Sequence, residues 1–598
     1  MPAPSPVDFS GPVVLSISVL INGTAVDDAY ALVSLNVINE VNRIPYAELV
    51  FVDGDPQTNT FPLSDSAGFA PGNPIEIKAG YGGVTTTIFK GNIVKQGIRI
   101  NATSANNVVL TCKHKAVALT YNKTEAEFSN KTDSDIITSI IGDYGVTVTV
   151  DSTSVTQETV FQKLATDWDF ILSRAQLYGY IITFNGDAMI IGAPKTSATA
   201  VLLIAAGDAV RTFNADVNAE KQAPGISASA WDIKGQTLLT ATAAEPSVNK
   251  QGSLTPKSLS EKLGQKNLTL NSCTPMAEDE LKAWADGALS RMRLSAIKGD
   301  VSFIGSALAV PGSIIELANL GKLFNGNAFV TSVNHVVEDG EWTTFAKFGL
   351  DNIAASELPD FSYPAAAGQL PAINGLQVAT VKKLFDDPDG QFRVLVTLVS
   401  NATSKDGIWA RMANFYATAG FGAGFMPEVG DEVVIGFLES NPRYPVILGS
   451  LYSNTRKTSN PAKDDNNYIK TITTKSNLKI SFDDEKKITK IETPGANSIT
   501  LSDDAKSIEI VDQNSNSIKM TSAGIILKSG KDITLDATGN ITLKATGKIE
   551  ITATQDAAIT GMNVTNTAQM GFTAKGTATA ELSASGQTTV KGGIVMIN

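Results

Sequence analysis

The chain has 598 residues, of which 43% are hydrophobic, and this length and apolar content suit several folded domains rather than a disordered chain. Its formal net charge of −12 argues against a nucleic acid or an anionic membrane as the main partner, because binding either one requires a basic surface. Only two cysteines occur, Cys112 and Cys273, and they exclude a disulfide framework.

Residues 1 to about 118 consist of short runs rich in Val and Ile, separated by Gly, Asn, Asp and Pro, which is typical of a barrel or sandwich. The first apolar run, Val13–Ile21, alternates as a strand does and has no cationic region before it. We therefore expect neither a signal peptide nor a transmembrane helix, and synthesis and assembly in the cytoplasm.

A helical insertion is predicted at about 120–195. In residues 132–145, isoleucines fall on one helical stripe, with Ser134 or Asp135 placed to cap the helix and Gly145 to end it. A second helix is predicted over Gln157–Tyr178, because its apolar residues recur at helical spacing.

A third helix is predicted to open at Thr274–Pro275, since proline is compatible with the first helical position. Strands follow it, with Asp339–Gly340 as the turn of a hairpin. Residues 1–357 are therefore expected to form one mostly β domain of the α+β class.

The remaining chain divides by composition. Residues 358–374 hold three prolines without a periodic pattern and indicate a linker. Residues 375–452 contain five predicted strands and suit a small closed barrel of the oligonucleotide/oligosaccharide-binding (OB) type. A second polar linker is expected at 453–468, before a repetitive β segment at 469–598.

The repetitive segment carries pairs of apolar residues, two positions apart, that recur every eight residues. The clearest members, expected to face a common core, are Ile525, Leu527, Ile533, Leu535, Ile541, Leu543, Ile549 and Ile551. Ordering eight residues costs roughly 8–16 kcal/mol, whereas burying two aliphatic side chains returns only roughly 3–6 kcal/mol. Each octad therefore needs a covering surface of the same period, either in a single-chain solenoid or in a prism of three chains.

No catalytic, cofactor-binding or metal site is predicted. The two histidines, His114 and His335, have no partner at metal-ligand spacing, and the motifs of zinc proteases, serine hydrolases and P-loop NTPases are absent from the sequence. In residues 406–442 the one basic side chain is Arg411, so the small barrel is not expected to bind nucleic acid.

Residues 420–453 resemble the signature of the VgrG spike family of contractile injection systems. The matching positions are Pro427, Gly430, Asp431, Glu432, Val433, Pro442, Pro445 and Gly449. Asn441 departs from the usual Asp at a turn. Residues 311–345 are similar to the hub portion of that family and of phage tail hub proteins, so the resemblance covers essentially the whole chain.

The resemblance implies a mainly β homotrimer. Its parts would be a phage-hub-like ring with two barrels per subunit on the hexameric inner tube, a collar of OB barrels, and a triple-stranded β-helical needle. This arrangement favours the three-chain prism. A PAAR-repeat tip protein is expected on the apolar end formed by Val590, Ile594, Met596 and Ile597.

The implied function is a non-enzymatic central spike that breaches a target envelope when a sheath contracts. Further implied partners are baseplate proteins, effector cargo and, transiently, the target membrane, with the protein released in or with the particle. We expect neither a lysozyme-like domain between 453 and 468 nor an effector domain after Asn598. The alternatives are a trimeric receptor-binding tail fibre and a spike with cell-wall hydrolase activity. The sequence does not distinguish a type VI secretion apparatus, an extracellular particle and a phage tail.

Overall fold

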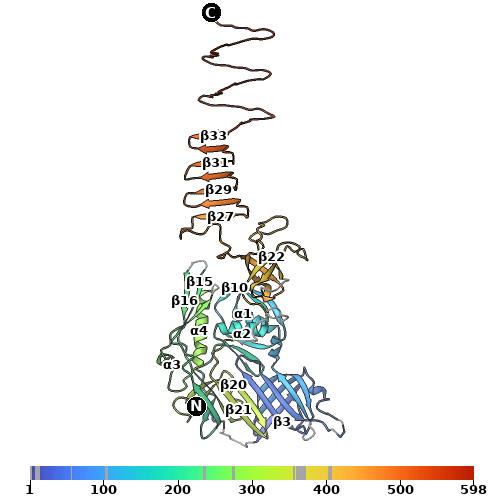
Figure 1. Ribbon diagram of the computed structural model, residues 1–598. Coiled ribbons are helices and arrows are strands. Elements are labelled where there is room, and N and C mark those ends of the chain that lie inside the picture. Colours follow the sequence, from blue (N-terminus) through green and yellow to red (C-terminus); the bar gives the residue numbers. More distant parts are fainter. Residues whose placement is uncertain are drawn as a thin grey trace. The chain divides into compact units, whose positions relative to one another are not determined.

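The computed structural model describes residues 3–6, 14–55, 57–58, 60–100, 105–232, 237–272, 276–354, 357, 372–401 and 407–597. The chain divides into two compact units, Met1–Leu451 and Tyr452–Asn598 (Figure 1). Strands predominate in both units, as the alternating sequence predicts.

The first unit is built on a thirteen-stranded sheet in which β14-β18-β21-β20-β3-β4-β7-β6-β5-β1-β2 are neighbours in this order, while β19 pairs with β20 and β13. The strands are β1 Leu15–Ile21, β2 Thr24–Ala25, β3 Leu32–Glu40, β4 Tyr46–Val52, β5 Pro74–Tyr81, β6 Val84–Arg99, β7 Asn107–Lys113, β13 Leu202–Ala205, β14 Val210–Val217, β18 Ile297–Ile304, β19 Ile314–Ala318, β20 Gly326–Glu338 and β21 Glu341–Phe348. The antiparallel pairing of β3 with β20 joins segments almost 300 residues apart, for example Asn36 with Val336.

Two hydrophobic cores lie against this sheet. One is formed mainly by β1 and β3–β7 and includes Leu35, Leu49 and Ile77. The other is formed by β13, β14 and β18–β21 and includes Phe303 and Phe348. The two predicted barrels correspond to two cores on one continuous sheet.

The predicted Asp339–Gly340 turn is confirmed. Glu338 pairs with Glu341 across the hairpin of β20 and β21. Asp339 and Gly340 have φ values of 52° and 78°, the positive angles that a two-residue type I′ turn needs.

The insertion contains a two-stranded sheet, a three-stranded sheet and two helices. Its elements are β8 Lys123–Thr132, α1 Asp133–Gly142, β9 Thr147–Val150, β10 Thr156–Thr166, α2 Asp167–Leu177, β11 Ile181–Asn185 and β12 Ala188–Gly192. The first predicted helix is confirmed as α1, but its cap is Thr132, whose Oγ1 accepts a hydrogen bond from the N–H of Asp135 at 3.2 Å. The proposed caps Ser134 and Asp135 lie inside the helix.

The prediction of a helix over Gln157–Tyr178 is wrong for its first half. Residues Thr156–Thr166 form β10, which pairs antiparallel with β8, and only Asp167–Leu177 are helical. The residues that pair with β10 lie about 30 residues earlier in the chain. Local spacing therefore did not reveal this strand.

A second group of elements packs around a core of its own. It comprises β15 Ile226–Asp232, β16 Thr237–Thr242, α3 Pro256–Lys262, β17 Leu268–Ser272 and α4 Glu278–Leu294. The third predicted helix is confirmed as α4, although its expected opening at Thr274–Pro275 lies outside the described residues. The helix α3 was not predicted, and both α3 and α4 lie beyond the predicted insertion.

Residues Gln377–Ser450 form the predicted five-stranded barrel, which is closed in the order β22-β23-β24-β26-β25. Its strands are β22 Gln377–Lys383, β23 Val394–Leu398, β24 Ile408–Met412, β25 Glu432–Phe437 and β26 Pro445–Ser450. Val381, Val396 and Ile435 belong to its buried core. The preceding linker prediction, 358–374, lies mostly outside the described residues.

The second unit begins with a stretch, up to Tyr468, that contains no helix or strand among its described residues, and the linker at 453–468 stays a prediction. Seven antiparallel strands follow as a meander, each paired with the next along the chain. They are β27 Ile469–Thr473, β28 Lys479–Asp483, β29 Ile488–Glu492, β30 Ser498–Ser502, β31 Ser507–Val511, β32 Ser517–Thr521 and β33 Gly524–Lys528.

Candidate self-association surface

The seven-stranded meander carries most of its apolar side chains on one face. Direct partners across antiparallel strands share a face, and the register aligns Ile472, Ile480, Ile491, Ile499, Ile510, Ile518 and Leu527 in one row. A second row on the same face contains Phe482, Leu501, Ile508, Met520 and Ile525. We call these two rows the ladder face.

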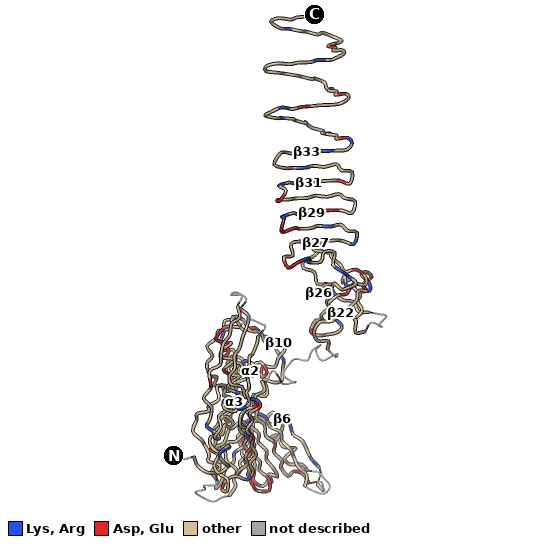
Figure 2. Tube along the Cα trace, turned by 60° about the vertical axis from the view of Figure 1, so that its left-hand side comes forward, with Lys and Arg blue, Asp and Glu red and all other residues tan. Residues whose placement is uncertain are grey.

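The opposite face is mostly polar, although Ile469, Ile488, Val511 and Ile526 also lie on it. Lys490, Thr500, Glu509 and Lys519 occupy consecutive strands there, and the Lys519 Nζ lies 3.4 Å from Glu509 Oε1. The charged residues also gather at the turns between strands (Figure 2). The side-chain hydrogen bond from Lys490 lowers the pKa of Glu492, since it favours the charged carboxylate.

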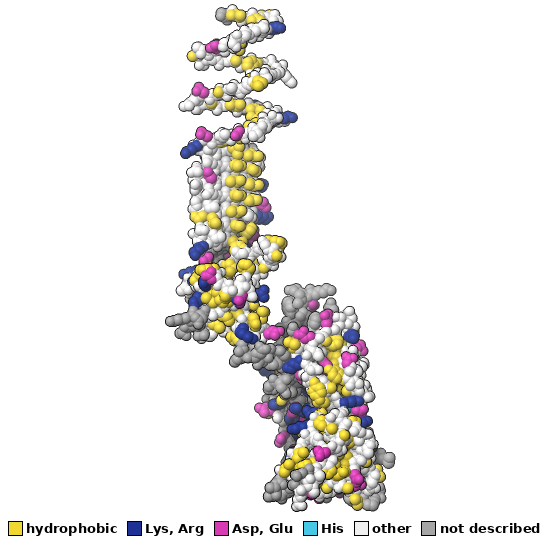
Figure 3. All heavy atoms as spheres, turned by 90° about the vertical axis from the view of Figure 1, so that its right-hand side faces the viewer, with side chains coloured by type: hydrophobic (Ala, Val, Ile, Leu, Met, Phe, Trp, Pro, Cys, Tyr) yellow, Lys and Arg dark blue, Asp and Glu magenta, His cyan; other side chains and the backbone are white. Residues whose placement is uncertain are grey.

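Nothing in the described part of the chain covers the ladder face. Ile499, Ile510 and Ile518 are 39%, 40% and 37% exposed, although each lies between apolar neighbours on both sides. Figure 3 shows apolar side chains stacked in a column along this unit. A single-layer sheet with one apolar face lacks the second layer that stable domains require.

Of the ladder face, Ile525 and Leu527 are the members that the sequence prediction includes, because its octad pattern starts at Gly524. The signal of the other members is present in the sequence as apolar pairs two residues apart, such as Ile499 with Leu501 and Ile508 with Ile510. In the triple-stranded β-helical needle that the resemblance implies, strands would pair with those of other subunits, but β27–β33 pair with one another within the chain.

The octad segment, residues 529–597, follows β33 as a regular zigzag without an assigned strand among its described residues (Figure 1). The eight predicted core residues lie in β33 and in this segment, and their exposed fractions range from 53% to 76%. The pairing of Ile518 with Leu527 and of Met520 with Ile525 shows that the first two of them belong to the ladder face. The other six continue the same odd-numbered pattern along the chain, and the single chain does not bury them.

The predicted tip residues Val590, Ile594, Met596 and Ile597 lie near the end of the zigzag and are 63% to 91% exposed. They make no contact with a core cluster among the described residues. They therefore form an uncovered apolar group in the single chain.

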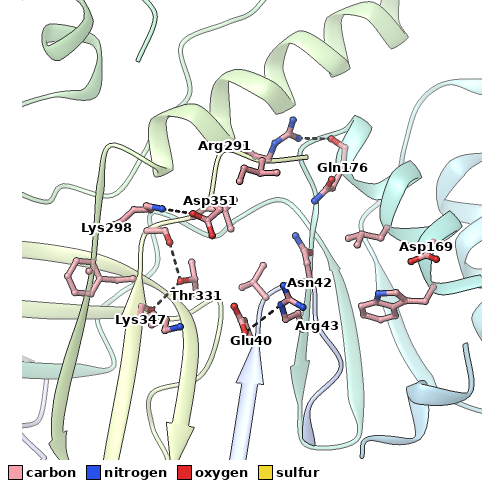
Figure 4. Close-up of a pocket in the computed structure, with 18 of the residues that line it drawn as sticks. Glu40, Asn42, Arg43, Asp169, Gln176, Arg291, Lys298, Thr331, Lys347 and Asp351 are labelled. Atoms are coloured by element: carbon pink, nitrogen blue, oxygen red, sulfur yellow. Dashed lines mark hydrogen bonds and ion pairs between the residues drawn. The ribbon is translucent and has the colours of Figure 1, made fainter. Parts of the chain in front are cut away.

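The first unit contains a cavity of about 680 Å³ where the ends of β3, β20 and β21 meet α2 and α4 (Figure 4). Arg291 in α4 donates through Nη1 to the main-chain oxygen of Gln176 at 3.0 Å, and burial lowers the pKa of its guanidinium. Lys298 is paired with Asp351, and Arg43 lies 3.7 Å from Glu40. The cavity lining holds neither histidine nor cysteine, and two of its four cations, Arg291 and Lys298, contact groups from other parts of the chain.

Both histidines are buried. His335 Nδ1 lies 3.0 Å from Thr344 Oγ1, and its ring packs on Trp342 with centroids 5.5 Å apart. Burial lowers the pKa of His114 and of His335 to about 4. Burial also raises the pKa of the Cys112 thiol to about 12, which makes it unreactive at neutral pH.

Among the described residues, no group of three or more His, Cys, Asp or Glu side chains is placed to hold a metal ion. No helix in the described ranges has both the length and the apolar character needed to cross a bilayer.

The chain combines a two-cored strand domain, a closed five-stranded barrel and a repetitive β segment, and matches of the last two parts to phage-baseplate families support a spike of a contractile injection system. The chain belongs to the family described as Alg8 N-terminal domain, whose family model matches residues 12–339, more than half of the chain. Matches to phage baseplate V domains and to curated VgrG proteins together support a spike of the VgrG type. The barrel matches the type VI secretion system/phage-baseplate injector OB domain at residues 377–452. Residues 487–539 match the phage baseplate V C-terminal trimerisation domain.

Curated relatives are similar over a short region. The type VI secretion system spike protein VgrG3 of Vibrio cholerae serotype O1 (strain ATCC 39315 / El Tor Inaba N16961) is 30% identical over 92 residues, which are 14% of this chain and 9% of that protein. The actin cross-linking toxin VgrG1 of Vibrio cholerae serotype O1 (strain ATCC 39541 / Classical Ogawa 395 / O395) is 28% identical over 92 residues, 14% of this chain and 8% of that protein. The chain thus spans less than a tenth of the length of these relatives.

Among solved structures, the tail protein from Neisseria meningitidis MC58 aligns with a TM-score of 0.42 and 12% identity. The alignment covers 57% of this chain and 99% of the tail protein.

Proposed function

We propose that the protein is the homotrimeric spike of a contractile injection system, in which three ladder faces meet on one axis. The observation that carries the proposal is the uncovered ladder face, which begins in β27 and lies within the region matched by the trimerisation domain from residue 487 onward. Three copies around an axis would cover one another's apolar rows and leave the polar face and charged turns in solvent.

The trimer supplies what the single chain lacks. The residual exposure of the ladder side chains represents apolar area that only another layer can remove from water. In the octad segment, strands without partners within the chain would obtain their backbone hydrogen bonds from the two other chains. A rod stabilised in this way is stiff along its length, as a spike driven by a contracting sheath has to be.

Native mass measurement of the purified full chain tests this proposal. The expected species has three times the chain mass of 62.9 kDa. A stable, folded species of 62.9 kDa would contradict the trimer and support the single-chain solenoid.

The apolar end is the second part of the proposal. Val590, Ile594, Met596 and Ile597, present three times, would bind a PAAR-repeat protein that sharpens the spike. Their exposure in the single chain and their position at the end of the repeat support this assignment. At the other end, the two-cored domain would dock on the hexameric inner tube and on baseplate proteins.

In this proposal the protein acts mechanically and catalyses no reaction. It punctures the target envelope when the sheath contracts, makes transient contact with the target membrane and delivers bound effector cargo, leaving the producing cell in or with the particle. Incubation of the purified trimer with cell-wall sacculi should release no muropeptides. Their release would show that the spike is also a hydrolase.

A further inference from the structure

The octad segment changes its apolar face once along its length. From Ile525 to Ile559 the large apolar residues are all odd-numbered except Ile526. From Met562 to Met596 they are even-numbered except Val595. The even-numbered set is Met562, Val564, Met570, Phe572, Leu582, Val590, Ile594 and Met596.

The small and polar residues follow the same division. Between Gly571 and Lys591 the odd-numbered positions are Gly, Thr, Lys, Glu, Ser and Gln, whereas Ala recurs at the even-numbered positions 574, 578, 580 and 584. Successive side chains of an extended chain point to opposite faces. An uninterrupted eight-residue repeat would keep the apolar face on odd numbers, so the change at Thr560–Gly561 marks a shift by one residue.

The backbone bends show the same shift independently. They fall at 530–531, 538–539, 546–547 and 554–555, then at Met562, and then at 569–570, 577–578, 585–586 and 593–594. The interval is eight residues on both sides of Met562. The pair at 569–570, however, follows the pair at 554–555 by fifteen residues, one fewer than two octads.

An odd interval reverses which residues point to a given face, and this reversal occurs where the apolar residues change from odd to even. A single extra or missing residue of this kind acts as a β-bulge does, and Gly561 lies at the change. The shift in the bends thus keeps the apolar side chains on one continuous face, which begins as the ladder face and enters the octads through Ile525 and Leu527 of β33.

We propose that the even-numbered apolar residues from Met562 to Met596 form the distal interface between copies of this chain, in continuation of the odd-numbered face. This assignment rests on the proposed trimer. The occupant is a second copy, because the face is continuous with the ladder face and has the same period as the surface that would cover it. Odd-numbered positions such as Thr573, which lies five octads after Ile533, face solvent.

The shift also divides the predicted tip residues. Val590, Ile594 and Met596 belong to the even-numbered inner face and contribute to trimer packing. Ile597, with Val595, stands on the odd-numbered face, which is polar in the preceding octads. These two residues are therefore the outward apolar surface of the last turn, which a protein can reach from the side, whereas the other three are reached at the end of the needle.

Adjacent substitutions in the full chain distinguish the shifted frame from an uninterrupted one. Phe572→Asp places three charges in the interface if the frame has shifted, and Thr573→Asp does so if it has not. We expect Phe572→Asp to lose resistance to trypsin at Lys575 and Lys591, detected by mass spectrometry of the fragments, and Thr573→Asp to retain it. Cleavage of Thr573→Asp with resistance of Phe572→Asp, or equal behaviour of the two, would overturn the inference.

Cysteine labelling provides a test that leaves the core volume almost unchanged. In the native protein, a maleimide should modify Thr579→Cys and leave Ala578→Cys protected, relative to the wild-type background from Cys112 and Cys273. Equal labelling would contradict the assignment of faces. A native mass of one chain for the wild type would reject the proposed function itself, whereas a trimer with the opposite labelling pattern would reject only the frame shift.

Discussion

Replacing Ile510 with Ala should weaken the trimer through the ladder face. Ile510 lies between Ile499 and Ile518 in the register and keeps 40% of its exposed area in the single chain. Fully burying an aliphatic side chain contributes roughly 1.5–3 kcal/mol, so covering the remaining area contributes about 0.6–1.2 kcal/mol per chain. Three copies lose about 2–4 kcal/mol of association free energy, a decrease of about 30- to 700-fold in the association constant.

The assay is native mass spectrometry over a dilution series, at a urea concentration where the wild type is partly dissociated. Thr500→Ala is the matched control, because it also removes a β-branched residue from a central strand but lies on the polar face between Lys490 and Glu509. Its trimer should dissociate at nearly the wild-type concentration. The reasoning is refuted if Ile510→Ala and Thr500→Ala dissociate alike, since the ladder face would then lie outside the interface.

Three further outcomes are expected. The pKa of His335 is about 4 in the folded state, below the ordinary 6.5, so the unfolded chain binds the proton more tightly and stability should fall as the pH drops from about 6.5 to about 4. Because His114 contributes over the same window, urea unfolding of His335→Gln should lose about 3 kcal/mol less than that of the wild type, and an equal loss in the two proteins would contradict this origin. Asp133→Asn should lower the free energy of unfolding by about 3 kcal/mol. In the wild type the Arg174 guanidinium lies 2.6 Å from the fully buried Asp133 carboxylate, and the substitution removes the negative charge that compensates it. Lys282→Gln, in an exposed pair, should cost less than about 1 kcal/mol in the same urea titration, and similar costs would refute the argument. Deleting Lys591–Asn598 should preserve the trimer in native mass measurement but abolish binding of a purified PAAR-repeat protein, and retained binding would place the tip site elsewhere.

Local periodicity was sufficient to predict an element where the buried side of that element is encoded in its own residues. The isoleucine stripe predicted α1, and the regular strand and turn pattern of 375–452 predicted a five-stranded barrel that the structure closes. The same approach failed at β10, whose strand state depends on pairing with β8. Whether Thr156–Thr166 form a strand is decided by residues of β8, which lie outside any local sequence window.

The candidate site was predictable in kind but not in extent. The octad pairs from Ile525 onward indicated a face that needs a partner, and the structure leaves these residues exposed. The ladder face upstream was missed because its strands recur at intervals longer than eight residues. The cavity beside Arg291 could not be predicted, since residues from Glu40 to Ile353 meet there only through the long-range pairing of β3 with β20.

The most direct test of the account is electron cryomicroscopy of the purified full chain. It should show three copies, with Ile499 and Ile510 of each copy directed toward a shared threefold axis along residues 469–528. Particles of a single chain, or a trimer in which these side chains face solvent, would contradict the account.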